Sequence, residues 1–541
     1  MLIVRKLSQK KIYVKDWMRF RPYEQFSKYD KSYTEVANEV LDILMEYESW
    51  FKKPTYGIKE LKELAVIITS YFEDFINEIG LWKAFVSFNK KELGYYLPFY
   101  PMDEYDPEYL NPEDFSFLIW HYMSWKEDVW YGPDAPNYLD LGQDLYNFLE
   151  PQVEDVPTTN FYKKFFTLST DDNFFVVKKK IRWLAMDSYI TGPEFSKQLE
   201  EKIEEFLEEN PDYKAPDLFG QILYAFQDDY IYDKRSALSA LSALDWFREV
   251  AICSSQMKEN LSNLHKRLMS GFLYKGASGN YHVFEHVQTQ RKFEVVKQSF
   301  SSMAGIKPGF YCILTLIQWN GEWWMTGTVM SGGELPPAEL ERIKKDWSGV
   351  PFYIYTEEQQ NRIWEDVKNM EAHFLDFFGE RVVVFKDHKE LEAAMKASNE
   401  VYNAKYATGE LSEERKKELK EKYGISGDEV DMNFGFEEGE GVGTAFVPGE
   451  GMIIESSTPR VIQLLNSDEL DREHKRELFD RLVFDLHPLS AEFLLKNYPT
   501  KNVVFPISVS KVDAIREFKF IKRYHNPNEF APPVPKQRLV V

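Results

Sequence analysis

A chain of 541 residues is longer than one hydrophobic core usually supports, so we expect about three or four domains. Its hydrophobic share of 44% and charged share of 28% are those of a globular protein and exclude a largely disordered chain. No window approaches about eighteen uncharged apolar residues, which excludes a membrane-spanning helix. Because there are only two cysteines, Cys253 and Cys312, and the apolar start is too short for a signal peptide, we expect a cytoplasmic protein.

The net charge of −22 is distributed unevenly along the chain. Residues 1–21 hold seven basic side chains against one acidic, and residues 511–541 hold seven against three. An acidic body repels nucleic acid, whereas basic ends can contact a phosphate backbone or an acidic partner. The side chains that we assign to such an anionic contact are Arg5, Lys6, Lys10, Lys11, Lys522, Arg523, Lys536 and Arg538. The alternative is that both ends are solvated tails.

The first half of the chain has the apolar spacing of helices. The clearest amphipathic stripe predicts a helix from Ile58 to Ile79 with one buried face. Asn111, Pro112 and the two acidic residues after them are typical of a helix start. Further helices are predicted at Tyr33–Trp50, Asn173–Ile190, Glu194–Glu208, Pro216–Asp229 and Ser236–Leu268.

Several segments of this half resemble an uncharacterised bacterial family, a domain of unknown function. The resemblance rests on IYVKDWMRFRPY near the start, then on SYFEDFINEIGLWKAF, YYLPFY and NPEDFSFLIWHY, and so covers about residues 11–150. Farther along the chain, YHVFEH and WNGEWWMTG are similar in pattern. The family brings no known activity, ligand or catalytic residue, so the resemblance implies no function.

The stretch from Asn280 to Gly327 is the one long run that predicts consecutive strands. Asn320-Gly321 lies between two aromatic and β-branched runs, which predicts a hairpin. Lys307-Pro308-Gly309 predicts another turn, because proline presets φ and glycine accepts a positive φ. Four or five short strands in about fifty residues indicate a small barrel or a curled sheet.

The last third of the chain alternates between helices and strands. Its predicted helices are Glu357–Phe378, Lys389–Tyr406, Ser412–Tyr423 and Ser490–Tyr498, with others beginning at Pro459 and Ser467. Its predicted strands are Arg381–Phe385, Val430–Phe436, Gly443–Val447 and Met452–Glu455. The tail APPVPKQRLVV is predicted to be extended, because its three prolines preclude a helix.

Together these patterns predict an α+β multidomain protein. Residues 1–275 form a helical domain, residues 276–332 a small β-barrel-like module, and residues 333–541 a mixed α/β domain with an extended C-terminal tail.

Two motifs that suggest ligand binding have a simpler interpretation. The glycine-rich stretch 439–443 has no basic residue and no helix after it, so it predicts a β-turn instead of a phosphate loop. His282 and His286 share one strand face about thirteen Å apart, too far for one metal ion. We therefore interpret both as surface or rim histidines.

A second set of ionisable residues lies in the helical half. Glu73, Asp74, His121 and the Glu127-Asp128 pair could meet as a carboxylate–histidine site. The half contains no Glu-x-x-His pair of the kind that a two-metal bundle needs, so capping and surface charge explain these residues better. The chain also lacks a GxSxG nucleophile motif. We predict no catalytic, cofactor or metal site.

The strongest candidate for a binding surface is a group of tryptophans in the β module, Trp319, Trp323 and Trp324. Strand alternation sends Trp323 and Trp324 to opposite faces, so one of them should face outward. Such a tryptophan, beside Arg291, Lys292 and Lys297, could stack on a base, a sugar or a partner's side chain. The alternative is that a neighbouring domain covers it.

We therefore expect a non-enzymatic cytoplasmic protein that binds or regulates a macromolecular partner. A protein is the expected partner, and RNA or the ribosome, contacted by the basic ends, is the alternative. No membrane contact and no cofactor are expected, and the sequence leaves a small-molecule ligand open. The other function class is a hydrolase-like enzyme whose dispersed catalytic residues form no motif.

Overall fold

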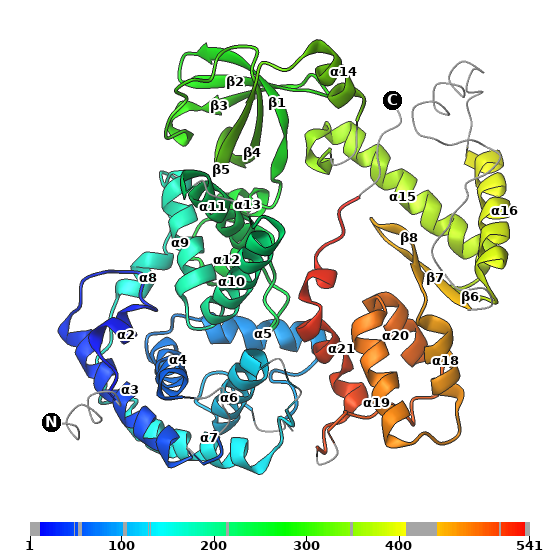
Figure 1. The fold of residues 1–541 in the computed structure, drawn as a ribbon. Coiled ribbons are helices and arrows are strands. Elements are labelled where there is room, and N and C mark those ends of the chain that lie inside the picture. The colour runs from blue at the N-terminus through cyan, green and yellow to red at the C-terminus, as the bar shows by residue number, and fades with distance from the viewer. Residues whose placement is uncertain are drawn as a thin grey trace. The chain divides into compact units, whose positions relative to one another are not determined.

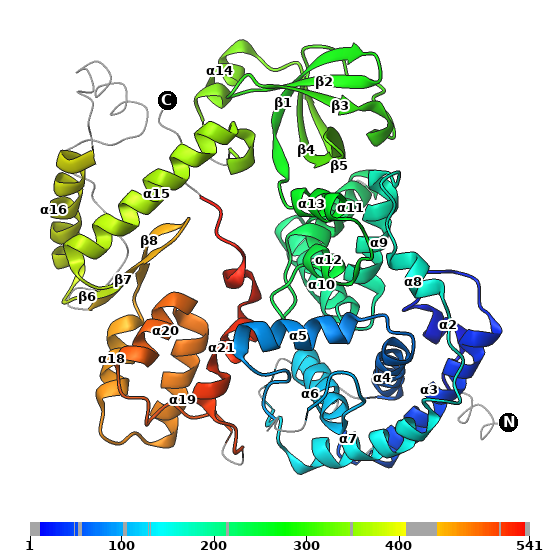
Figure 2. The ribbon, with the colours of Figure 1, turned by 180° about the vertical axis from the view of Figure 1, so that it is seen from behind.

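The computed structural model describes residues 11–47, 49–51, 57–100, 105–127, 129, 131–211, 216–346, 350–406, 441–507 and 510–535. The chain divides into two units (Figures 1 and 2). Unit 1 contains the chain up to His265 together with Phe505–Ala531, and unit 2 contains Lys266–Val504 together with the chain from Pro532. Helices build unit 1, whereas both sheets lie in unit 2, which confirms the α+β multidomain class.

Unit 1 is a helical unit. Its helices are α2 (Val14–Met18), α3 (Lys28–Glu46), α4 (Ile58–Ile76), α5 (Leu81–Leu93), α6 (Pro112–Glu127), α7 (Pro136–Leu149), α8 (Phe161–Phe166), α9 (Phe174–Asp187), α10 (Gly192–Glu209), α11 (Pro216–Tyr232), α12 (Ala243–Val250), α13 (Ser255–Asn263) and α21 (Ala514–His525). Within the described ranges, no helix combines the length and the apolar character needed to cross a membrane.

Helix α4 lies inside unit 1, where it packs against α3, α5 and α6. The sequence predicts one buried face, but every residue from Leu64 to Asp74 is buried. A helix that is covered on all sides places its polar residues in the interior as well. This is why Glu73 and Asp74, which an amphipathic pattern assigns to the surface, lie inside the protein.

The long helix predicted from Ser236 to Leu268 is wrong. Two shorter helices, α12 and α13, occupy part of this range, and strand β1 already begins at Leu268. The side chains of Ser242 and Ser254 accept hydrogen bonds from the first turns of α12 and α13, so both serines start a helix instead of continuing one. Serine favours helix caps over helix interiors for this reason.

Unit 2 begins with the predicted barrel. Its strands close in the order β1-β2-β3-β5-β4. They are β1 (Leu268–Ser278), β2 (Tyr281–His286), β3 (Lys292–Val296), β4 (Tyr311–Trp319) and β5 (Glu322–Gly333). The predicted hairpin at Asn320-Gly321 is confirmed, since both residues have positive φ angles, 50° and 79°, as a type I′ turn requires.

The barrel also corrects the interpretation of one histidine. His286 is fully buried, so it is not a surface or rim residue. Its ring nitrogens lie 2.9 Å from the hydroxyls of Ser270 and Thr289, and burial lowers its pKa to about 4. A polar side chain can face a barrel interior when both its nitrogens have partners there.

The rest of unit 2 contains α14 (Pro337–Lys345), α15 (Glu357–Phe378), β6 (Val382–Phe385), α16 (His388–Tyr406), β7 (Val442–Val447), β8 (Gly451–Glu455), α18 (Thr458–Asn466), α19 (Arg472–Asp480) and α20 (Pro488–Asn497). Strands β6, β7 and β8 pair in that order as an antiparallel sheet. The helix predicted at Ser412–Tyr423 and the strand predicted at Val430–Phe436 lie outside the described residues.

Candidate functional site

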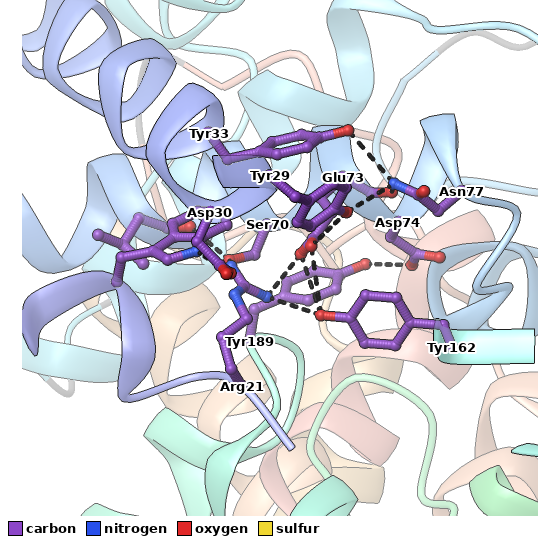
Figure 3. Close-up of polar contacts among 12 residues, drawn as sticks. Arg21, Tyr29, Asp30, Tyr33, Ser70, Glu73, Asp74, Asn77, Tyr162 and Tyr189 are labelled. Atoms are coloured by element: carbon purple, nitrogen blue, oxygen red, sulfur yellow. Dashed lines mark hydrogen bonds and ion pairs between the residues drawn. The ribbon is translucent and has the colours of Figure 1, made fainter. Parts of the chain in front are cut away.

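A cluster of buried ionisable groups surrounds Glu73 on α4 (Figure 3). A nitrogen of the Arg21 guanidinium lies 2.6 Å from one Glu73 oxygen, and Tyr29 donates a 2.7 Å hydrogen bond to the other. The hydroxyl of Tyr162 lies 3.3 Å from both oxygens. Burial alone would lower the pKa of Arg21, but the Glu73 carboxylate raises it. Burial raises the pKa of Glu73, and the charge of Arg21 opposes that shift. We call these four residues the Glu73 cluster.

The Glu73 cluster joins distant parts of unit 1. Arg21 follows α2, Tyr29 lies on α3, and Tyr162 lies on α8, so three segments meet on one carboxylate of α4. Arg21 also donates a 2.8 Å hydrogen bond to Ser70, and its guanidinium lies 3.6 Å from the centre of the Trp17 ring. These contacts connect the helices of unit 1 through a buried ion pair, so we assign the cluster a structural role and not a catalytic one. In the sequence analysis Arg21 is one of the seven basic residues at the start of the chain, but only 7% of the surface of Arg21 is exposed.

Asp74, the next residue, fixes the start of α5. Its oxygens accept hydrogen bonds from the backbone N–H groups of Gly80, Leu81 and Trp82 at 2.7, 3.2 and 2.8 Å, and from the hydroxyl of Tyr189 at 2.6 Å. Unpaired N–H groups at a helix start favour such an anion. Burial raises the pKa of Asp74, and the hydrogen bonds oppose that shift.

A second buried carboxylate, Asp114 on α6, lies in a similar setting. It accepts hydrogen bonds from Tyr71 at 2.7 Å, Tyr105 at 2.8 Å and the indole nitrogen of Trp82 at 3.0 Å. Burial raises the pKa of Asp114 to about 6, although these donors favour the ionised form. A carboxyl group with a pKa near neutrality is suited to proton transfer.

Asp74 and Asp114 both line a cavity of about 600 Å³ in unit 1. The cavity has the size of an ordinary small-molecule site. Tyr71 and Trp82 contribute aromatic walls, and the ion pair between Lys83 and Glu108 lies at its lining. Two carboxyl groups with raised pKa values, those of Asp74 and Asp114, thus line the same cavity.

The residues considered for a carboxylate–histidine site do not meet at one place; each of those that the structure describes has a different partner. Glu73 pairs with Arg21, Asp74 binds Tyr189, and Glu127 binds Tyr131. Nδ1 of His121 lies 2.9 Å from the hydroxyl of Tyr524, and burial lowers the pKa of His121 to about 3. Asp128 lies outside the described residues.

Unit 2 has its own candidate, a cavity of about 610 Å³ that we call the aromatic groove. Its rings belong to Trp323 on β5, to Phe352 and Tyr353 in the segment before α15, and to Trp364 on α15. Arg291, which precedes β3, also lines the groove. The remaining lining comprises the polar or charged residues Lys266, Gln318, Thr356, Glu357, Gln360 and Asn361, together with Tyr355, Pro533, Val534 and Pro535.

Arg291 fixes the shape of the aromatic groove. It donates a 2.9 Å hydrogen bond to the carbonyl oxygen of Ile354 and so ties the segment before α15 to the barrel. Its guanidinium lies 4.9 Å from the centre of the Phe293 ring and 5.9 Å from that of Trp323. Burial lowers the pKa of Arg291. The residue therefore supports the groove wall, and its charge is partly committed to this contact.

The residues predicted to bind a partner separate into three groups. Trp323 and Arg291 line the aromatic groove. Trp319 and Trp324 are buried, with 1% and 6% of their surface exposed, so neither presents a recognition surface. Lys292 is exposed on β3 away from the groove lining, and Lys297 donates a hydrogen bond to the carbonyl oxygen of Gly279.

The sequence missed the half of the groove that comes from beyond the barrel. Phe352, Tyr353 and Trp364 lie more than twenty positions after Trp323 in the chain, and no local pattern joins the two sets. The signal available in the sequence was the aromatic run PFYIY next to a helix that carries a tryptophan.

Two of the side chains assigned to anionic contact are buried, which corrects that assignment. Lys522 and Arg523 on α21 expose 1% and 2% of their surface. Lys522 lies 3.3 Å from Glu529, and Arg523 donates a 2.9 Å hydrogen bond to the carbonyl oxygen of Leu238. Neither can reach a phosphate. Lys11 is exposed, and the other five residues, Arg5, Lys6, Lys10, Lys536 and Arg538, lie outside the described ranges.

No group of three or more His, Cys, Asp or Glu side chains in the described part of the chain is arranged to hold a metal ion. We take the cavity of unit 1 and the aromatic groove of unit 2 as the candidate sites.

Residues 11–302 match the model of a family described as a protein of unknown function (DUF3843). The match spans more than half of the 541 residues and confirms the resemblance drawn from the sequence. It includes the Glu73 cluster, the cavity of unit 1 and strands β1 to β3. Comparison with curated proteins and with solved structures gave no match. On the strength of the family match, the chain belongs to the DUF3843 family.

Proposed function

We propose that the protein is a non-enzymatic cytoplasmic binding protein that holds a protein partner in the aromatic groove. The observation that carries this proposal is the groove itself, about 610 Å³ in volume, in which rings from two parts of unit 2 face one space. Trp323, Tyr353 and Trp364 are only partly buried, so their surfaces are available to a partner. Tryptophan and tyrosine are the residues that most often anchor a protein partner.

The lining of the groove favours a protein over a nucleic acid. Phosphate recognition needs several uncommitted cations, and here Arg291 already binds the carbonyl oxygen of Ile354. Lys266 and Glu357 both line the groove, so the positive charge of the lysine is balanced by a negative one. Amide groups, such as those of Gln318 and Asn361, can pair with the backbone of a bound peptide.

The experiment is a comparison of groove variants in the full chain. The native protein is purified from its source, bound proteins are identified by mass spectrometry, and bound nucleic acid is detected by a stain. Rebinding of the identified partner, itself purified, is then measured for wild type, Trp364→Ala and Asn361→Ala. We expect both variants to weaken binding at least about tenfold, which is about 1.4 kcal/mol.

Lys368→Ala is the matched control, because Lys368 is exposed on the same helix but does not line the groove. It should leave partner binding unchanged. The proposal fails if the groove variants bind the partner as tightly as wild type. A different outcome is that nucleic acid is recovered with the protein, and that nuclease treatment removes both this nucleic acid and all protein partners. The partner would then be RNA and not a protein.

An enzyme is the second candidate function, and the cavity of unit 1 is the observation that favours it. Asp114, with its pKa raised to about 6, and Asp74 both line this space. We infer that any chemistry there uses Asp114 as an acid or base in hydrolysis. Wild type, Asp114→Asn and the exposed control Asp140→Asn would be screened against chromogenic ester, glycoside and phosphate substrates. Hydrolysis by wild type and by Asp140→Asn but not by Asp114→Asn would support the enzyme, and no hydrolysis by wild type would remove it.

A further inference from the structure

A segment of the chain's own C-terminal tail forms part of the wall of the aromatic groove. Pro533, Val534 and Pro535 line the groove together with the aromatic rings. In Figures 1 and 2, the last red part of the chain runs up to α15, whose first turns border the groove. Pro535 is buried, whereas Val534 keeps 38% of its surface exposed. Pro533 is exposed as well, so Pro535 is the residue of this segment that is covered.

The tail follows a defined path in unit 2. It passes the turn between β7 and β8 so closely that a Cβ atom at Gly449 would lie 3.1 Å from Cβ of Pro533 and 3.2 Å from the carbonyl oxygen of Val534. Gly449 has a φ of 85°, which an L side chain rarely adopts. The tail is therefore positioned by the turn on one side and by the aromatic groove on the other.

The sequence of the tail suits an aromatic groove. Proline lacks a backbone N–H and has a preset φ, so Ala531-Pro-Pro-Val-Pro535 is held extended before it binds and loses little conformational entropy on binding. Extended proline-rich segments bind grooves lined by aromatic rings in several unrelated protein modules. The Gln318 amide lines the same groove and can donate to a carbonyl oxygen of a bound segment.

We propose that the aromatic groove recognises extended, proline-containing segments of protein partners, and that residues 532–535 are its internal ligand. This inference rests on the proposed function and names the chemistry of the partner. A partner's segment that packs on the rings in the place of residues 532–535 must displace the tail from that wall of the groove. The tail thus sets a threshold for partner binding, because a tethered ligand acts at an effective concentration of about 1 mM or less.

The test uses a fluorescein-labelled synthetic peptide that carries residues 529–541. Its binding is measured by fluorescence anisotropy to the full chain and to a variant that ends at Ala531. We expect the shortened chain to bind the peptide, and the full chain to bind it at least about tenfold more weakly, because the tethered tail competes. A peptide in which Pro533 and Pro535 are replaced by alanine should lose binding to the shortened chain.

Two further measurements keep the result interpretable. In the full chain, the double variant Pro533→Ala/Pro535→Ala should bind the unaltered peptide more tightly than wild type, without any truncation. In the shortened chain, Trp364→Ala should weaken peptide binding and the control Lys368→Ala should not.

Three outcomes would overturn the inference: no peptide binding to the shortened chain, equal binding to both chains, or equal binding of the alanine peptide. If the peptide does not bind while the groove variants still lose an identified partner, the internal ligand is disproved and the proposed function stands. If neither the binding of the peptide nor the binding of a partner depends on the groove residues, both the internal ligand and the proposed function are disproved.

Discussion

At the scale of single residues, two adjacent tryptophans on β5 should behave differently. Trp324 exposes 6% of its surface, whereas Trp323 is half-buried against Phe293, whose ring centre lies 5.1 Å away. We predict that Trp324→Ala lowers the free energy of unfolding by about 3–5 kcal/mol, as truncation of a large core side chain does. Trp323→Ala should lower it by only about 1–2 kcal/mol and should impair partner binding. Urea unfolding of both variants measures the difference, and equal large losses would show that both rings are core.

His286 gives a second prediction at this scale, because it is buried and its pKa is lowered to about 4. Below a pH of about 6.5 the unfolded chain binds a proton at this histidine that the folded chain does not bind. Stability should therefore fall as pH falls from about 6.5 to about 4, by up to about 3 kcal/mol.

In the variant His286→Asn this contribution is absent. Its free energy of unfolding, measured in urea at pH 7 and pH 5, should decrease less over that interval than the free energy of wild type. An equal decrease in both proteins would mean that His286 is protonated in the folded state. Ser270 and Thr289, its two hydrogen-bond partners, are uncharged and do not titrate in this range.

From the sequence, Trp323 and Arg291 are predicted to bind a partner; both line the aromatic groove, and their role in binding stays a prediction. Arg523 was assigned to an anionic contact because the end of the chain is basic, and this assignment failed because a distant partner decides its burial. The carbonyl oxygen of Leu238, far away in the chain, provides the partner that permits burial.

At the scale of elements, α4 depends on its buried ion pair. Glu73 exposes none of its surface and lies 2.6 Å from Arg21. Glu73→Ala leaves the Arg21 guanidinium buried without its counter-charge, so we predict a loss of about 3–5 kcal/mol in the free energy of unfolding. Thermal unfolding followed by circular dichroism measures it.

The matched control is Glu35→Ala on α3, where the glutamate lies 3.6 Å from Lys31 and both side chains are largely exposed. An exposed pair of this kind contributes little, so the midpoint of unfolding should stay close to that of wild type. Similar midpoints for the two variants would show that Arg21 finds another partner once Glu73 is gone.

The elements themselves were predictable to the extent that their signals are local. The Asn320-Gly321 hairpin depends on two residues that accept positive φ, so the sequence alone defines it. The break between α12 and α13 was missed because serine occurs both inside helices and at their starts. All-round burial of α4 depends on α3, α5 and α6 together, and no single helix pattern contains that information.

At the scale of the whole molecule, the chain order does not follow the two units. Residues Phe505–Ala531 belong to unit 1, although Lys266–Val504 of unit 2 separates them in the chain from the other helices of unit 1. The three-part division at about residues 275 and 332 stays a prediction, and the return of α21 to unit 1 had no signal in local composition.

This arrangement predicts that two C-terminal truncations differ in their effect on the stability of unit 1. On α21, Phe520 lies 5.2 Å from the ring of Phe99, and Tyr524 lies 5.2 Å from that of Trp120. A chain that ends at Val504 loses both rings, at about 3–5 kcal/mol each, which is a large part of the about 5–15 kcal/mol that stabilises a typical domain. A chain that ends at Ala531 keeps α21 and should keep the unfolding transition of unit 1 unchanged. Differential scanning calorimetry distinguishes the two, and an intact unit 1 transition in the chain ending at Val504 would show that α21 is dispensable for that unit.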